Sequence, residues 1–231
     1  MSELSKLESI LNYKFKNRDY LKQALVHRSY LNEHLDFTLG HNERLEYLGD
    51  AVLELVVTEY LYEKFPEKDE GVLTNWRAAL VNSKMLYQVA SSLNIEEFLH
   101  LSKGEAKDKS SKSRRYILAD SVEAIIGAMY LDKGINPAKK FISKNIISNL
   151  EEIINKGLYL DPKSRFQELS QEKEGTTPHY NLLEESGPDH EKTFVVGLYL
   201  KDKLVASGKG LSKHEAQVKA AQVGLVKKGW Q

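Results

Sequence analysis

Three absences narrow the classes of protein to which this sequence can belong. It contains no cysteine, which excludes disulfide bridges and zinc sites built on thiolates and fits a reducing compartment. It has no run of about 18 apolar residues, so we expect no transmembrane helix and no membrane partner. The segment 1–15 is polar and amphipathic and lacks the apolar core of a secretory signal. Together these features predict a cytoplasmic protein.

The sequence also lacks a net charge, because 33 Lys and Arg balance 33 Asp and Glu. A nucleic-acid-binding protein is usually basic, so the total weighs against that function. The distribution is uneven, however: segment 103–115 has six basic against two acidic residues, and segment 209–228 has five against one. Taken alone, either run is explained most simply as a solvated surface.

The first two thirds of the chain have the spacing of amphipathic helices. Apolar residues recur at intervals of three and four, as in Leu45, Leu48 and Val52. Such spacing predicts an all-helical region. Further helices are predicted over 73–93, 115–131 and 137–154, the last with Pro137 at its first position.

The pattern changes after residue 154. Residues 155–162 form a short polar segment with glycine and proline, which predicts a linker. The rest has the order α-β-β-β-α, so the fold class is α + α/β: a helical domain over 1–154 and a small mixed domain over 163–231. The elements expected there are a helix over 164–174, strands over 179–183, 193–200 and 204–207, and a last helix capped by Ser212 and Glu215.

Two of the predicted helices carry acidic residues among apolar ones. At about 100° per residue, Glu43, Glu46 and Asp50 fall on one stripe of the first helix. Asp120 and Glu123 share a face of the second helix, which is almost wholly apolar. Like charges at this spacing destabilise a helix by about 0.2–0.5 kcal/mol per pair. These acids therefore work against helix stability unless something neutralises them.

A metal ion would neutralise these acids economically. A buried carboxylate must be paired, protonated or metal-bound, and no Lys or Arg lies between Tyr116 and Leu131. Small residues such as Gly49 and Gly127 would let the two helices pack closely and bring four carboxylates together. Oxygen ligands suit magnesium, manganese or calcium, and a di-iron site would need Glu-x-x-His pairs that neither helix has. The residues alone predict a hard-metal site, with solvated acidic stripes as the alternative.

Segment 42–53, NERLEYLGDAVL, closely resembles the signature of the ribonuclease III family. Segment 117–124, ILADSVEA, is similar to the second acidic segment of that family. Segments 164–169, 187–190 and 212–216 resemble a double-stranded-RNA-binding domain. The resemblance covers nearly the whole chain in the correct order. It implies a bacterial-type endoribonuclease that hydrolyses double-stranded RNA with Mg²⁺, for which Mn²⁺ is a plausible substitute.

The resemblance also implies products, partners and catalytic residues. The products would have 5′-phosphate and 3′-hydroxyl ends with a short 3′ overhang, in the processing of ribosomal and messenger RNA. The enzyme would be a homodimer and would have no small-molecule substrate. By position, Glu46, Asp50, Asp120 and Glu123 match the catalytic, metal-binding acids of the family.

Three further residues match positions around the cleft and the dimer interface. Glu43 and Glu70 match acids that shape the cleft. Tyr47 stands where the family usually has a phenylalanine that docks into the partner subunit. The additional hydroxyl needs a polar partner if it is buried there.

The resemblance in the second domain implies how it would hold RNA. Its first helix would enter one minor groove, its first strand connection the next, and the start of its last helix would hold the phosphates between them. Lys213 is followed by a histidine where consecutive lysines are common, so we expect a shallower salt dependence than for a lysine-rich relative. The matched residues are Gln167, Glu168 and Gln171 in the helix, Pro188 and His190 in the connection, and Ser212 and Lys213 in the last helix.

Two other functions stay open at this point. A non-catalytic double-stranded-RNA-binding protein on a degenerate nuclease fold would lack one or more of the four acids, and all four are present. A helical metal-storage or structural protein would leave the C-terminal domain unexplained. No Ser-His-Asp or Cys-His arrangement stands out, so the predicted chemistry is metal-assisted hydrolysis, with water activation and stabilisation of the leaving 3′ oxygen.

Overall fold

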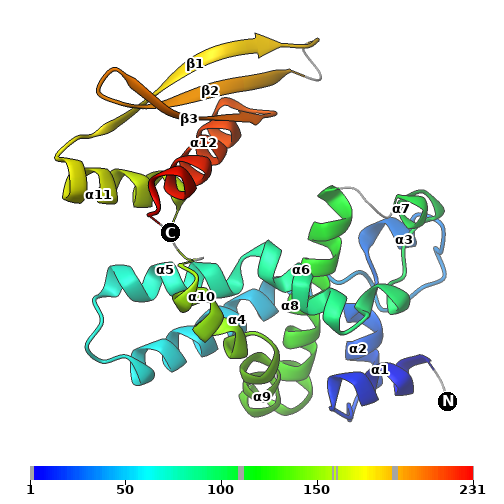
Figure 1. Ribbon diagram of the computed structural model, residues 1–231. Coiled ribbons are helices and arrows are strands. Elements are labelled where there is room, and N and C mark those ends of the chain that lie inside the picture. Colours follow the sequence, from blue (N-terminus) through cyan, green and yellow to red (C-terminus); the bar gives the residue numbers. More distant parts are fainter. Residues whose placement is uncertain (1–2, 109–111, 158, 160, 189–191, 231) are drawn as a thin grey trace. The chain divides into compact units, whose positions relative to one another are not determined.

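The computed structural model describes residues 3–108, 112–157, 159, 161–188 and 192–230. The chain divides into two compact units, Met1–Ile153 and Ile154–Gln231 (Figure 1). The first unit is helical and the second has the order α-β-β-β-α, which confirms the predicted fold class. Within the described ranges, no helix is both long and apolar enough to cross a membrane.

The described residues of the first unit form helices, with one isolated bridge between Val26 and His100. Two of its segments, η1 and η2, are 3-10 helices. In chain order the elements are α1 (Glu3–Leu11), α2 (Arg18–Ala24), α3 (Arg28–Leu31), α4 (Glu43–Lys64), α5 (Glu70–Val81), α6 (Ser83–Ser92), η1 (Ile95–Phe98), α7 (Lys103–Lys107), α8 (Lys112–Lys133), α9 (Ile135–Asn145), η2 (Ile147–Asn149) and α10 (Leu150–Asn155).

Helix α8 forms the centre of the first unit. It packs against α2, α4, α6 and α9, and Figure 1 shows it among them. From Ile117 to Met129 every residue is buried except Asp120 and Glu123. A helix that is apolar all round belongs in a core. The two acids are thus the only interruptions of a core helix.

Helices α4 and α8 approach each other until their backbones touch. A methyl group on Gly49 of α4 would overlap the backbone carbonyl of Glu123, and one on Gly127 of α8 would overlap the carbonyl of Leu45. Only glycine, which has no Cβ, allows backbones to come this close. The predicted close packing through small residues is confirmed.

Two of the predicted helices are wrong as single helices. The expected helix over 73–93 is two helices, because Asn82 has an extended backbone and its side chain caps α6 by accepting the N–H of Met85 at 2.9 Å. An asparagine that can bond to the following turn favours a new helix start over a continuous helix. The expected helix over 137–154 is divided into α9, η2 and α10, since α9 ends at Asn145 and a 3-10 helix follows. Helix α9 begins at Ile135, after Gly134 with φ +75°, so Pro137 is its third residue and not its first.

The second unit is a three-stranded sheet with two helices packed on one face (Figure 1). The strand order is β1-β2-β3 and both pairs are antiparallel. Each outer strand is longer than the sequence predicted. The elements are α11 (Pro162–Glu174), β1 (Pro178–Ser186), β2 (Thr193–Leu200), β3 (Lys203–Gly210) and α12 (Lys213–Lys228).

The core of the second unit lies between the sheet and its helices. The predicted alternation along β2 is seen, since Val196, Leu198 and Leu200 are buried. The predicted cap of α12 is also present, because the Ser212 hydroxyl accepts the N–H of Glu215 at 3.1 Å. The core residues are Phe166, Leu198, Leu200, Ala206, Ala220, Ala221, Leu225 and Trp230.

Replacement of Gly49 by alanine tests the contact between α4 and α8. We expect Gly49→Ala to destabilise the protein by at least about 1–3 kcal/mol, because the new methyl group meets immovable backbone. Gly71→Ala in α5 is the matched control, since nothing lies within 4 Å of its Cβ position. It should be neutral or stabilising by up to about 1 kcal/mol. Urea unfolding of both variants makes the comparison, and equal stability would contradict the backbone contact.

Candidate active site

Three carboxylates from two helices converge where α4 and α8 cross. Glu46 of α4 and Asp120 and Glu123 of α8 each offer an oxygen, and these oxygens lie within 4.8 Å of one another. All three side chains are part-buried. Oxygen atoms this close on a firm helical frame can share one cation.

Positive charge does not neutralise this group. Across the described parts of the chain, Glu46, Asp120 and Glu123 form no ion pair and no side-chain hydrogen bond. When these acids are ionised, no side chain described in the structure compensates their negative charge next to the core.

Burial and mutual repulsion hold protons on this group. Burial, followed by the charges of Asp120, Glu43 and Asp50, raises the pKa of Glu46 to about 7. Burial, followed chiefly by the charges of Asp50 and Asp120, raises the pKa of Glu123 to about 8. Burial also raises the pKa of Asp120. A divalent cation would compete with these protons and favour the charged carboxylates.

Asp50 stands apart from the other three predicted ligands. It follows Glu46 by one turn of α4 but is exposed, and it is not among the three acids whose oxygens lie together. Its charge still raises the pKa of both Glu46 and Glu123. Asp50 therefore lies at the solvent side of the group.

The acidic stripe of α4 behaves differently at its ends and in its middle. Glu43, at the start, lies 3.6 Å from Arg28 and 3.7 Å from the His41 ring nitrogen. Glu54, which continues the stripe, forms an ion pair of 2.9 Å with Arg77. Ion pairs thus neutralise the acids at both ends of the stripe, whereas Glu46 in the middle has no such partner among the described residues.

The residues predicted near the cleft and dimer interface do not join the acidic group. Glu70 is the first residue of α5, accepts the Thr74 hydroxyl at 3.4 Å and lines a pocket of about 610 Å³. Tyr47 is 81% exposed on α4. An aromatic ring this exposed is available to a partner.

One residue that the sequence analysis did not single out positions the first acids. Asn42 is buried, its N–H donates to the Val26 carbonyl at 2.9 Å, and its side-chain amide donates to the Ala24 carbonyl at 3.4 Å. These bonds fix the start of α4 against the end of α2. The only signal in the sequence was an asparagine before a helix, which usually caps the helix with its own side chain.

The residues predicted to bind RNA are exposed where the structure describes them. This group is Gln167, Glu168 and Gln171 on α11, Pro188 after β1, and Ser212 and Lys213 at the start of α12. His190 lies outside the described residues.

Comparison with known families accounts for both units. A family described as Ribonuclease-III-like matches residues 17–150, and the double-stranded RNA binding motif matches residues 162–227. The chain belongs to the ribonuclease III family. This confirms the family that the two acidic segments predicted.

Similarity to ribonuclease III extends over the whole chain. It is 44% identical over 222 residues to Ribonuclease 3 of Carboxydothermus hydrogenoformans, covering 96% of this chain and 94% of that protein. It is 43% identical over 229 residues to Ribonuclease 3 of Campylobacter jejuni, covering 99% of each. The solved nuclease domain of ribonuclease III from C. jejuni, which has a region involved in dimer formation, matches with a TM-score of 0.57 and 44% identity, over 64% of this chain and 98% of that domain.

The raised pKa values predict how pH affects stability without metal. Because the pKa values of Glu46 and Glu123 lie above the ordinary 4.5, the folded state binds more protons than the unfolded state between pH 4.5 and about 8. The stabilising contribution is therefore present at the acid end and is lost as the pH rises through 7 and 8. Thermal unfolding in a chelator should show this decline.

Removal of one charge should reduce this pH effect. We expect Glu123→Gln to flatten the decline and to raise Tm at pH 8 by about 2–4 °C, roughly 1 kcal/mol after solvent screening. Glu63→Gln, which removes an exposed carboxylate near the end of α4, should leave the decline unchanged. A decline equally steep in Glu123→Gln and in the unmodified protein would contradict the assignment.

Proposed function

We propose that this member of the ribonuclease III family is a magnesium-dependent endoribonuclease specific for double-stranded RNA. The observation that carries the proposal is the unneutralised group of Glu46, Asp120 and Glu123 in a chain of this family. Its products would be 5′-phosphate and 3′-hydroxyl ends.

The donor set fits a hard divalent cation. Glu46, Asp120 and Glu123 offer only carboxylate oxygens, which suit Mg²⁺ and, as a substitute, Mn²⁺. Asp50, at the solvent side, would add a fourth carboxylate toward the substrate. When bound, the cation would lower the pKa of a water molecule and stabilise the leaving oxygen.

The protein residues would orient the reaction. Hydrolysis adds water across the bond between phosphorus and the 3′ oxygen, so the phosphate stays on the 5′ end and the 3′ oxygen gains a proton. The carboxylates of α4 and α8 are held by helices in backbone contact, so little motion is needed to align them. Repulsion within the group is strongest when no cation is present, which favours metal binding over an empty charged site.

The two units would divide the work. We assign the nuclease to residues 1–154, a linker to 155–162 and the RNA-binding domain to 163–231. The two matched families, over 17–150 and 162–227, support this division. The exposed residues of α11 and the start of α12 would contact the minor grooves and phosphates of the duplex.

We also propose that the enzyme acts as a homodimer. Large side chains recur on α4 with high exposure: Tyr47 at 81%, Leu55 at 62% and Tyr62 at 75%. Exposed apolar groups of this size on one helix favour a partner surface. The C. jejuni nuclease domain has a region involved in dimer formation, which supports a dimer of this chain. In that dimer, Tyr47 would dock into the partner, and Glu43 and Glu70 would lie near the cleft. The two curated relatives named above are bacterial ribonucleases III. We propose that this enzyme acts in the cytoplasm in the processing of ribosomal and messenger RNA.

Loss of a single ligand should separate cleavage from binding. We expect Glu123→Gln and Asp50→Asn to lower the cleavage of duplex RNA by about 100-fold or more and to leave RNA binding largely intact. A chelator should have the same effect on the unmodified enzyme. Glu63→Gln is the control and should cleave at the normal rate. A gel assay with Mg²⁺ measures the cleavage rate. Cleavage by Glu123→Gln at the full rate would contradict the proposed site.

Two variants in the second unit test how duplex RNA is held. Lys213→Ala should weaken binding to duplexes of every sequence and lower the slope of log affinity against log salt by about 0.9, because one phosphate contact is lost. Gln167→Ala should have a smaller effect and leave this slope unchanged, since it would act in the minor groove. Fluorescence anisotropy at several salt concentrations measures both. Equal affinity for RNA and DNA duplexes of equal length would show that the unit does not select A-form RNA.

A further inference from the structure

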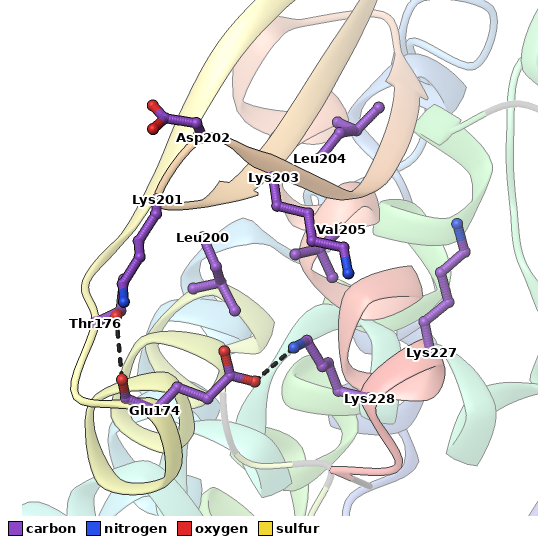
Figure 2. Close-up of a pocket in the computed structure, with 10 residues that line it drawn as sticks. All are labelled: Glu174, Thr176, Leu200, Lys201, Asp202, Lys203, Leu204, Val205, Lys227 and Lys228. Atoms are coloured by element: carbon purple, nitrogen blue, oxygen red, sulfur yellow. Dashed lines mark hydrogen bonds and ion pairs between the residues drawn. The ribbon is translucent and has the colours of Figure 1, made fainter.

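A basic pocket lies in the second unit, away from the residues that we propose contact duplex RNA. It is a pocket of about 780 Å³ formed where the turn between β2 and β3 meets the ends of α11 and α12 (Figure 2). Its lining residues are Glu174, Thr176, Leu200, Lys201, Asp202, Lys203, Leu204, Val205, Lys227 and Lys228.

Positive charge dominates this pocket. Four of the eleven Lys and Arg residues of segment 160–231 line it, against two acids. Lys228 is paired with Glu174 at 2.5 Å, and the carboxylate of Asp202 points away from the hollow in Figure 2. Across the described ranges, Lys201, Lys203 and Lys227 form no ion pair. The pocket therefore offers uncompensated amino groups to an anion.

Helix-end electrostatics accounts for only part of this cluster. Lys227 and Lys228 lie in the last turn of α12, where cations stabilise the carbonyl end of a helix. Lys201 and Lys203 belong to the hairpin and have no such role. Lys201 has φ +52°, a left-handed conformation that glycine and asparagine adopt more readily than lysine. A lysine at this position contributes charge at the expense of local stability.

The pocket is separated from the predicted phosphate contact of the duplex. Lys213 begins α12 and Lys227 lies near its end, so their positions are about 21 Å apart along the helix. The Nζ of Lys213 lies 5.9 Å from the ring centroid of Phe194, near the start of β2, whereas the pocket includes Leu200 at the end of that strand. One phosphate cannot contact both sites.

We propose that this pocket binds the backbone phosphates of a single-stranded RNA segment adjoining the duplex, an inference that rests on the proposed RNA-binding function of this unit. A hollow admits a flexible strand more readily than a rigid double helix. The amino groups would contact phosphates, and Leu204, 48% exposed, with Val205 would offer an apolar wall to a sugar or base. The site would let the enzyme hold a hairpin loop or unpaired flank next to the duplex that it cuts.

The experiment compares two RNA probes on the full chain in a chelator, so that the RNA stays intact. One probe is a blunt duplex, and the other is the same duplex with a single-stranded extension of roughly ten nucleotides. The unmodified protein should bind the extended probe more tightly and with a steeper salt slope. The double variant Lys203→Gln, Lys227→Gln should lose this difference, about tenfold in affinity and about 1.4 in slope for two single-strand contacts.

Two further variants make the comparison specific. Lys209→Gln removes an exposed lysine from the same strand as Lys203 but outside the pocket, and it should keep the preference for the extended probe. Lys201→Asn removes a charge and tolerates the left-handed turn, so it should lower the preference without loss of stability.

The outcomes separate this site from the function of the unit. The single-strand site is overturned if the double variant keeps the full preference for the extended probe. It is also overturned if the variant's affinity falls by the same factor for both probes. Equal binding of both probes by the unmodified protein overturns it as well, while the proposed duplex-binding function stands. If the unmodified protein binds neither probe, both the single-strand site and the proposed duplex-binding function are contradicted.

Discussion

The backbone contact between α4 and α8 is the constraint on which the site depends. Gly49 and Gly127 have no Cβ, and each lies against a carbonyl of the other helix. Because Glu123 itself supplies one of these carbonyls, the helix crossing and the acidic group occupy the same place. Ordinary side chains at the crossing would hold the helices about 8–10 Å apart between axes and separate the carboxylates of Glu46 and Glu123. Close packing therefore creates the acidic group as well as the core.

The same packing makes the acidic group unfavourable in the absence of a cation. Asp120 and Glu123 interrupt a helix that is otherwise buried from Ile117 to Met129, and burial is the first cause of their raised pKa values. Along α4 the protein pairs Glu54 with Arg77 but provides no partner for Glu46. A stripe that pairs Glu43 and Glu54 with cations and leaves Glu46 opposed to acids of the neighbouring helix has the arrangement of a functional site.

The sequence predicted those features that depend on local spacing. Periodicity predicted α8 and β2, and helical geometry brought Glu46, Asp120 and Glu123 onto facing stripes. It did not predict the break at Asn82, because the apolar spacing continues through it. It could not predict the basic pocket, whose lysines come from a hairpin turn and a helix end that only the tertiary fold brings together.

The zero net charge weighed against nucleic-acid binding. It is the sum of acidic and basic residues that lie in different parts of the molecule. The acids of the candidate site lie at one crossing of two helices, where a bound divalent cation would offset most of their negative charge and offer a positive centre to a phosphate. In the second unit, lysines gather at the two ends of α12, while acids elsewhere keep the sum near neutral. Placed charges of this kind limit non-specific attraction to polyanions and leave selectivity to geometry. For a nuclease that must distinguish duplex RNA from other nucleic acids, neutrality overall and charge at a few positions are therefore compatible.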